Sequence, residues 1–362
     1  MSNLSTDIAK RRLYAQQLSG TTFRTAQQTV AWLGAVQGQE YAQTKWGLGL
    51  RLPHLNDSTI EQELTDGKII RTHLLRPTWH LVSSQDIRWL LQLTGPRVNA
   101  ANASMYARLE LDTPLFKRCN TILGQLLEGN RHLTREEINA EFKKNKIEAQ
   151  GLRLSYLMMR AELDGLVCSG IRRGSQSTYA LLEERVAPTR FLDPEEALAE
   201  LTKRYFASRG PATMQDFSTW SGLSLTHCKK GVVLTASWLE RCPIEGKDYY
   251  FPADTASQPA PEPQVYLLPI YDEYIMGYQD RTAYLALKNV LTPSPPFVYN
   301  SMVVVDGQIL GTWKRTLGKQ AIEMAVDLFQ PFTSVQQKAF DQAIHRFEAF
   351  NGLPLNKTGR PN

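Results

Sequence analysis

Hydrophobic residues recur at helical spacing near the start of the chain. Ala26, Val30 and Leu33 fall on one face of a segment from Thr25 to Val36, as in an amphipathic helix. Three more helices are predicted around this one. They run from Ser5 or Thr6 to Gly20, through Trp46 to about Leu50, and from the capping pattern Ser58–Glu61 to Asp66-Gly67.

Alternating hydrophobic and polar positions follow these helices directly. They predict two strands, Ile69–Leu75 and Thr78–Val82, joined by Arg76-Pro77. Helices followed by a β-hairpin are typical of a winged helix-turn-helix unit. We therefore predict a first winged helix over residues 1–95.

The same order of elements recurs along the chain. A second predicted hairpin follows Glu162–Gly165 and has its tip at residues 172–176. A third unit begins at Asp193, a good helix cap, with Pro194 at the first helical position. The interval of roughly a hundred residues indicates a tandem array rather than a short-period solenoid. The second and third winged helices are predicted over residues 96–190 and 191–252.

The last part of the chain has a β pattern. A proline-rich linker is predicted over residues 253–263, a small barrel-like β domain with a closing helix over 264–352, and a frayed tail over 353–362. The fold class is therefore predicted as α+β. Asp306-Gly307 indicates a hairpin turn. The predicted elements are strands Val265–Ile270, Ala283–Leu287, Phe297–Val305 and Ile309–Trp313, and a helix from Ser334 to Phe350.

Composition excludes several classes of protein. Of the 362 residues, 42% are hydrophobic and 21% are charged, which is ordinary for a globular protein. No apolar run approaches the ~20 residues of a membrane span, and the N-terminus has no secretory signal. Four widely spaced cysteines fit neither a zinc finger nor a disulfide scaffold, so the reducing cytoplasm is the expected compartment.

The net charge and the short sequence motifs do not identify a specific function. The net charge of +5 permits nucleic-acid binding without demanding it. The chain has no HExxH, GxSxG or GxGxxG motif, and Gln320 stands where a phosphate loop needs Ser or Thr. The six histidines make no metal-ligand spacing with the cysteines. We expect no metal and no cofactor.

Several segments together resemble one known family. They are Val36–Arg51, Ile70–Thr72, Arg76–Val82 and Asp86–Trp89, with Tyr271–Arg281 and Asp306–Arg315 nearer the C-terminus. The chain resembles, over nearly its whole length, the AlkZ family of bacterial DNA glycosylases. The resemblance implies three winged helices followed by a small barrel. It also implies excision of alkylated purines, chiefly bulky N7-alkylguanine, and some members of the family unhook interstrand crosslinks.

The resemblance also implies the catalytic residues. The family uses a Gln–aliphatic–Gln or Gln–aliphatic–Asp triplet in the first winged helix, and Gln37 and Gln39 occupy its outer positions. Gly38 departs from the pattern, because a larger aliphatic residue is usual there. Glycine loosens the backbone by roughly 0.5–1 kcal/mol, which affects the rigidity of the pair. Without the resemblance, the two glutamines would be interpreted as a polar helix terminus.

Elementary chemistry agrees with a pair of amides. An N7-alkylguanine is already cationic, so the base leaves readily, and the sugar passes through an oxocarbenium-like transition state. A side-chain amide offers an acceptor oxygen and a donor NH2, which suffice to place a water and stabilise charge. No lysine nucleophile is indicated. We therefore expect a monofunctional hydrolase that does not cut the strand.

Basic residues near the predicted hairpins are candidate DNA contacts. Arg172 and Arg173 lie at a hairpin tip, where the alternative is a solvated turn. Lys314 and Arg315 follow Trp313, and the alternative is a core tryptophan beside surface charge. The candidate DNA-binding residues of the first unit are Arg51, Arg71 and Arg76.

Two further pairs of neighbouring residues are ambiguous. Trp79 and His80 alternate on a strand, so one of them faces inward, and a buried, hydrogen-bonded His80 is favoured over an active one. Asp272 and Glu273 resemble paired glycosidase carboxylates, but neighbours on a strand point to opposite faces. A structural acid that bonds Arg281 is the favoured interpretation.

Two functional hypotheses remain. The first is a DNA-repair glycosylase that acts on double-stranded DNA with alkylated bases, as a monomer in the cytoplasm at the nucleoid. The second is a non-enzymatic winged-helix DNA-binding protein or transcriptional regulator, because fold alone does not settle function. A regulator usually reads a palindrome as a dimer, and no dimerisation helix stands out here.

Overall fold

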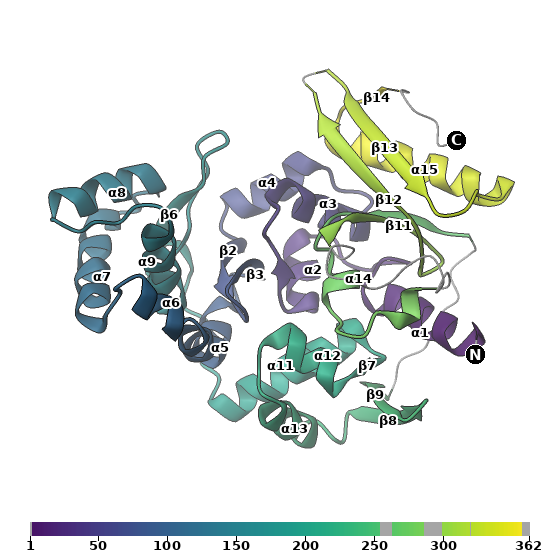
Figure 1. Ribbon diagram of the computed structural model, residues 1–362, viewed down its shortest axis with the longest axis horizontal. Helices are drawn as coiled ribbons and strands as arrows, with labels where there is room; N and C mark the ends of the chain where they lie inside the picture. Colours follow the sequence, from purple (N-terminus) through teal and green to yellow (C-terminus); the bar gives the residue numbers. More distant parts are fainter. Residues whose placement is uncertain (1, 254–262, 286–298, 319, 357–362) are drawn as a thin grey trace.

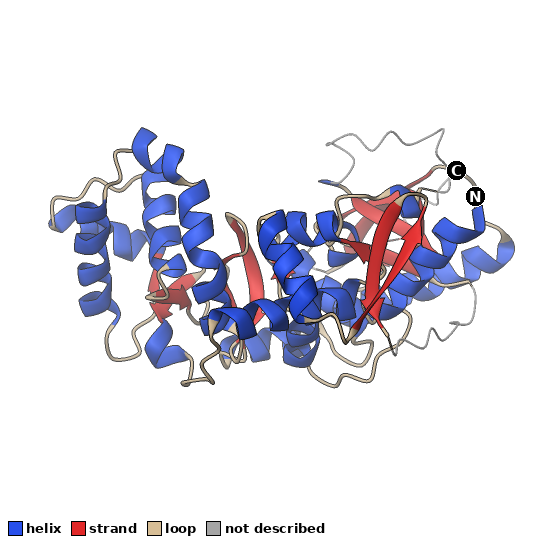
Figure 2. Cartoon of the chain, turned by 90° about the horizontal axis from the view of Figure 1, so that it is seen from below, coloured by secondary structure: helices blue, strands red, loops and turns tan. Residues whose placement is uncertain are grey.

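The computed structural model describes residues 2–253, 263–285, 299–318 and 320–356 of the chain. These residues form a mixed α+β fold, in which small sheets alternate with groups of helices (Figure 1, Figure 2). Three three-stranded sheets and one five-stranded sheet are found among them. No helix in this part of the chain is long and apolar enough to cross a membrane. The predicted α+β class is confirmed.

The first group of elements includes the sheet at the centre of the molecule (Figure 1). Thr25 begins its second helix with a capping box, in which its hydroxyl and the side chain of Gln28 each accept the other residue's backbone N–H. The sheet is antiparallel, with the order β1-β3-β2. The elements are α1 (Ser2–Ala15), α2 (Ala26–Leu33), β1 (Val36–Gln37), α3 (Tyr41–Arg51), α4 (Asp57–Thr65), β2 (Ile69–Leu74) and β3 (Thr78–Ser83).

The second group repeats this order and has a hydrophobic core of its own, which includes Leu123, Phe142 and Leu157. Its sheet has the order β4-β6-β5, and a long hairpin tip projects from β5 and β6 beside the first group (Figure 1). The elements are α5 (Ile87–Ala101), α6 (Ala103–Arg108), α7 (Thr113–Leu127), β4 (Leu133–Thr134), α8 (Arg135–Lys144), α9 (Leu152–Leu163), β5 (Val167–Ser169), β6 (Thr178–Leu181) and α10 (Leu182–Arg185).

The third group begins where the sequence predicts it. The Asp193 carboxylate accepts the backbone N–H groups of Glu195 and Glu196, which caps the helix that follows. A third antiparallel sheet has the order β7-β9-β8. The elements are α11 (Pro194–Arg209), β7 (Ala212–Thr213), α12 (Met214–Ser221), α13 (Leu225–Leu234), β8 (Leu239–Ile244) and β9 (Lys247–Pro252).

The C-terminal group packs against the first group. The ring of Trp46 on α3 lies 4.8 Å from the ring of Phe347 and 5.2 Å from that of Phe350, both on the last helix. One large core joins residues of all four groups, and it includes Leu90 of α5 and Cys168 of β5 from the second group. The elements are β10 (Val265–Leu268), α14 (Glu273–Met276), the 3-10 helix η1 (Thr282–Tyr284), β11 (Ser301–Val305), β12 (Gln308–Leu317), β13 (Ile322–Leu328), α15 (Ser334–Asn351) and β14 (Leu355–Asn356).

The C-terminal sheet differs from the predicted one in three ways. The order β10-β11-β12-β13-β14 places β10 and β14 at opposite edges, so the described strands form an open sheet rather than the expected barrel-like closure. The predicted strand at Ala283 is wrong, because residues 282–284 form η1. β13 is not predicted, although its apolar residues alternate from Ile322 to Leu328, a strand signal that went unused.

Helix boundaries in the first group also differ slightly. The first helix ends at Ala15 rather than near Gly20. Helix α4 is capped by Asn56, whose side chain accepts the Thr59 backbone N–H, and not by Ser58. Most of the predicted linker, all of residues 286–298 and the last six residues of the tail lie outside the described part of the chain.

Candidate active site

The two predicted catalytic glutamines lie between the end of β1 and the start of α3. Gln37 pairs with His80 across the sheet, and the ladder continues because the Gly38 N–H donates to the Trp79 carbonyl at 2.7 Å. Gln39 follows in the turn before α3, and its side chain is exposed. The segment is therefore an extended strand end rather than a helix terminus.

Gln37 is 5% exposed and fixed by bonds at three points. Its backbone N–H donates to Glu273 Oε1 at 2.8 Å, and its carbonyl accepts from the Thr44 hydroxyl at 3.2 Å. Its side-chain oxygen accepts from the Arg76 guanidinium at 3.2 Å. The amide nitrogen has no partner among the described residues and is not sealed from solvent, so it stays available as a donor.

Gln39 is held by its side-chain oxygen, which accepts the Trp79 backbone N–H at 3.0 Å. Each of the two amide oxygens thus accepts one hydrogen bond and keeps one further acceptor position, and each NH2 group is free to donate. Such a pair can hold a water molecule or the oxygens of a deoxyribose. The arrangement suits positioning and electrostatic stabilisation, since an amide is not a general base at neutral pH.

A fully buried ion pair stands behind Gln37. Arg209 Nη2 lies 2.5 Å from Glu273 Oε2, which also accepts from the Trp220 indole N–H at 2.9 Å. The same guanidinium donates to the carbonyls of Leu33 and Ala35, just before β1. Residues from the third and C-terminal groups therefore fix the backbone around β1. The sequence analysis found Glu273 but not Arg209, because nothing local links them.

Arg51 and Asp272 form a second buried pair, which overturns two predictions. Arg51 is 2% exposed, and its guanidinium donates to both Asp272 oxygens, at 2.9 and 3.0 Å. The prediction that Arg51 contacts DNA is wrong, because its charge is neutralised inside the core. Asp272 does not bond Arg281, whose Nε donates to the Ile275 carbonyl instead.

Arg76 lies beside Gln37. Its guanidinium donates to the Gln37 side-chain oxygen and to the Trp220 carbonyl. In this half-buried position it orients the Gln37 amide, and its contact with DNA stays a prediction. Burial lowers the pKa of Arg76.

His80 is buried, as predicted, and hydrogen-bonded. Its Nδ1 lies 2.9 Å from the Thr78 carbonyl, and its Nε2 lies 3.5 Å from the Arg76 guanidinium. Burial, and secondarily the charge of Arg76, lowers the pKa of His80 well below its usual value. His80 is therefore a neutral structural residue and not an acid–base group.

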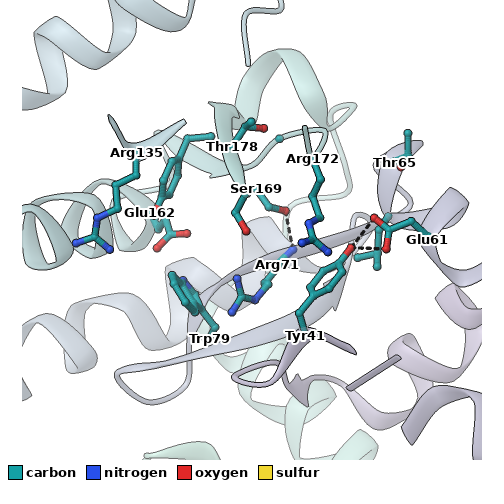
Figure 3. Close-up of a pocket in the computed structure, with 14 residues that line it drawn as sticks. Tyr41, Glu61, Thr65, Arg71, Trp79, Arg135, Glu162, Ser169, Arg172 and Thr178 are labelled. Carbon is teal, nitrogen blue, oxygen red and sulfur yellow. Dashed lines mark hydrogen bonds between the residues drawn. The ribbon is translucent and has the colours of Figure 1, made fainter. Parts of the chain in front are cut away.

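A cavity of about 100 Å³ lies between the first and second groups, and its lining includes Tyr41, Arg71 and Trp79 (Figure 3). Arg172, at the hairpin tip, stacks 4.2 Å from the centre of the Tyr41 ring, and the Tyr41 hydroxyl bonds Glu61. Arg173 points elsewhere and pairs with Glu137 at 2.8 Å. The two arginines at the tip thus have different surroundings.

Two predicted DNA contacts, Lys314 and Arg315, lie on β12 of the C-terminal sheet. Trp313 is buried, and its indole N–H donates to the Leu268 carbonyl at 2.9 Å, so it is a core residue beside surface charge. Lys314 is exposed and has no ion pair within the described residues. Arg315 is half-buried, 5.4 Å from the centre of the Phe347 ring.

A metal site has no support in the described ranges, where no group of three or more His, Cys, Asp or Glu side chains is placed to hold an ion. The four cysteines are free thiols, and three of them are buried.

Comparisons with known proteins identify the family of the chain. The family model described as DNA glycosylase AlkZ-like matches residues 30–350. An interstrand DNA cross-link repair glycosylase of Streptomyces sahachiroi is 24% identical over 321 residues, which cover 84% of this chain and 85% of that protein. The structure of the Streptomyces sahachiroi DNA glycosylase AlkZ superposes with a TM-score of 0.78, at 21% identity, over 97% of this chain and 98% of that one.

The structural likeness shows a shared fold, and the family match spans most of the chain, including Gln37 and Gln39. The chain belongs to the AlkZ-like family of DNA glycosylases and is an enzyme of that class.

Proposed function

We propose that this enzyme hydrolyses the N-glycosidic bond of alkylated purines in double-stranded DNA, chiefly bulky N7-alkylguanine, including those in interstrand crosslinks. The observation that carries the proposal is the pair of amides at the end of β1, each with a free NH2 group and a fixed oxygen. The name of the Streptomyces relative, an interstrand DNA cross-link repair glycosylase, supports the crosslink substrate.

In the proposed reaction, the positive charge of the lesion drives departure of the base. Gln37 and Gln39 hold the attacking water and the sugar while an oxocarbenium-like centre forms. Amides supply position and dipoles but no strong base, so labile, charged adducts react and neutral lesions react poorly.

Water is the proposed nucleophile, and the enzyme is monofunctional. Lys45, the lysine closest in sequence to the glutamines, is 5% exposed and pairs with Asp57 and Glu61 at 2.8 and 2.7 Å. A lysine held in this way is not free to form a Schiff base with the sugar. An abasic site without strand scission is the expected product.

DNA binding is proposed to use three winged helices, over residues 1–95, 96–190 and 191–252, and the β domain over 264–352. Each of the first three units has helices followed by a three-stranded sheet, which supports this division. Arg172, Arg173, Lys314 and Arg315 remain the proposed phosphate contacts of a monomer that works at the nucleoid.

The test uses duplex DNA that carries N7-methylguanine or a nitrogen-mustard crosslink, followed by alkaline cleavage of abasic sites. Alkali-labile products at the lesion are expected, with no scission before alkali. The non-enzymatic regulator considered from the sequence has no observation in its favour, because the chain belongs to a family of DNA glycosylases. The absence of alkali-labile products from every alkylated duplex would overturn the proposed substrate.

A further inference from the structure

Gly38 separates the two proposed catalytic amides, and residues 37–39 are called the catalytic segment here. Glycine adds backbone freedom at a point where the amides need fixed positions. A Cβ at this position would lie 3.3 Å from the His80 carbonyl carbon and the Leu81 nitrogen, so β1 approaches β3 closely here. Glycine thus allows a tight strand pair at the expense of stiffness.

Arg71, on β2, acts directly on this flexible residue. Its Nε donates to the Gly38 carbonyl at 2.9 Å, and one of its terminal nitrogens donates to the Gln39 carbonyl at 3.4 Å. Because the Gly38 N–H already bonds the Trp79 carbonyl, both polar groups of the glycine are engaged. A planar guanidinium is suited to hold two neighbouring carbonyls at once.

Arg71 is itself fixed from two sides (Figure 3). Its guanidinium carbon lies 3.8 Å from the centre of the Trp79 ring, a close cation–π contact. Its backbone N–H donates to the hydroxyl of Ser169, on β5 of the second group, at 2.9 Å. Trp79 in turn donates its backbone N–H to the Gln39 side chain. Arg71, Trp79 and the segment Gly38-Gln39 form a closed set of contacts.

We propose that Arg71 is a positioning residue for base excision. Its hydrogen bonds restrict the backbone of the catalytic segment, which Gly38 makes more flexible. This proposal rests on the proposed glycosylase function. It also replaces the prediction that Arg71 contacts the DNA backbone, because the guanidinium is half-buried and its bonds point to the enzyme's own carbonyls.

Removing Arg71 should have different effects on DNA binding and excision rate if it is a phosphate contact than if it is a positioning residue. A phosphate contact, when removed, weakens DNA binding and lowers the dependence of log Kd on log salt by about one. A positioning residue leaves both nearly unchanged and lowers the excision rate of bound DNA. Misplacement by about 1 Å is enough for a loss of about a hundredfold.

The experiment compares wild type, Arg71→Ala and Arg71→Lys on N7-methylguanine duplex. It measures single-turnover excision at saturating enzyme and DNA affinity across a salt series. Arg71→Ala is expected to lose tenfold to about a hundredfold in rate, with less than a twofold change in Kd. Arg71→Lys keeps the charge but lacks the planar, fixed fork of donors that holds both carbonyls in place, so it should also be slow.

Two controls separate positioning from general damage. Arg190→Ala removes an exposed arginine that lies just before the third group and pairs with Glu196, and it should excise like wild type. Adding guanidinium ion to Arg71→Ala, with sodium chloride at the same concentration for comparison, should restore part of the rate. A merely misfolded variant would not be rescued and would bind DNA poorly.

Each outcome has a distinct meaning. If wild type excises no base, the proposed function and the role of Arg71 both fail. If wild type is active and Arg71→Ala excises equally fast, only the role of Arg71 is overturned. A weaker Kd with a salt dependence reduced by about one, and an unchanged rate for bound DNA, would instead establish a phosphate contact.

Discussion

The buried carboxylate of Glu273 accepts the backbone N–H of Gln37 at 2.8 Å, although 236 positions separate the two residues. The contact links the C-terminal half of the chain to β1. Arg209 and Trp220 donate to the other oxygen of the same carboxylate. Glu273 thus fixes the backbone at Gln37.

Replacing Glu273 by glutamine should destabilise the whole enzyme. The substitution leaves Arg209 as an unpaired charge in the core, which costs about 3–5 kcal/mol in the free energy of unfolding. Urea unfolding followed by fluorescence measures the loss. The matched control is Glu195→Gln, an exposed residue paired with Lys230, for which we expect a change below about 0.5 kcal/mol. Equal stabilities of the two variants would contradict the account.

The lowered pKa of His80 predicts that the free energy of unfolding falls in acid. Its pKa is lowered in the folded state, so the unfolded chain binds the proton more readily, and stability falls as pH drops below the ordinary histidine value of 6.5. The contribution is at most about 1.4 kcal/mol per pH unit. His80→Gln should flatten the decline between about pH 6.5 and about pH 5 in urea unfolding. An unchanged slope would show that His80 titrates normally.

Gly38→Ala should weaken the β1–β3 pair. The added Cβ meets the backbone of His80 and Leu81 at 3.3 Å, and backbone atoms give way less easily than a side-chain end. We expect a loss of about 1–3 kcal/mol in stability and a slower excision step. Thermal unfolding and single-turnover kinetics measure the two effects. A fully stable and active variant would mean that the strands separate freely at this point.

The salt dependence of DNA binding distinguishes the roles of Lys314 and Arg51, which the sequence analysis both predicted to contact DNA. Lys314 is exposed without an ion pair within the described residues, so Lys314→Ala should lower the slope of log Kd against log salt by about one. Arg51→Ala should leave the slope unchanged and destabilise the fold, since Asp272 loses its buried partner. The reverse pattern would mean that Arg51 leaves its pair when DNA binds.

Local structure was largely predictable from the sequence. Capping residues such as Thr25 and Asp193, and apolar alternation around Thr78–Val82, specify their elements through neighbours in the chain. The family resemblance located Gln37 and Gln39 through a short local motif. Two predictions within the C-terminal group were wrong. A strand was predicted where η1 forms, and none was predicted at β13, although its apolar residues alternate.

The partners of the charged residues were not predictable in the same way. Arg51 meets Asp272, and Arg209 meets Glu273, across distances in sequence that no periodicity encodes. The sequence around an arginine does not distinguish a side chain that faces solvent from one that donates to a buried carbonyl. Burial decides between these roles, and burial follows from packing of groups that lie far apart in the chain.

The central claim is that the amides of Gln37 and Gln39 carry out base excision. It is tested most directly by single-turnover excision of N7-methylguanine by the double variant Gln37→Ala/Gln39→Ala, with DNA affinity and melting temperature measured on the same protein. The account predicts a folded variant that binds duplex DNA like wild type and releases no base above the uncatalysed rate. Full excision by that variant would contradict it.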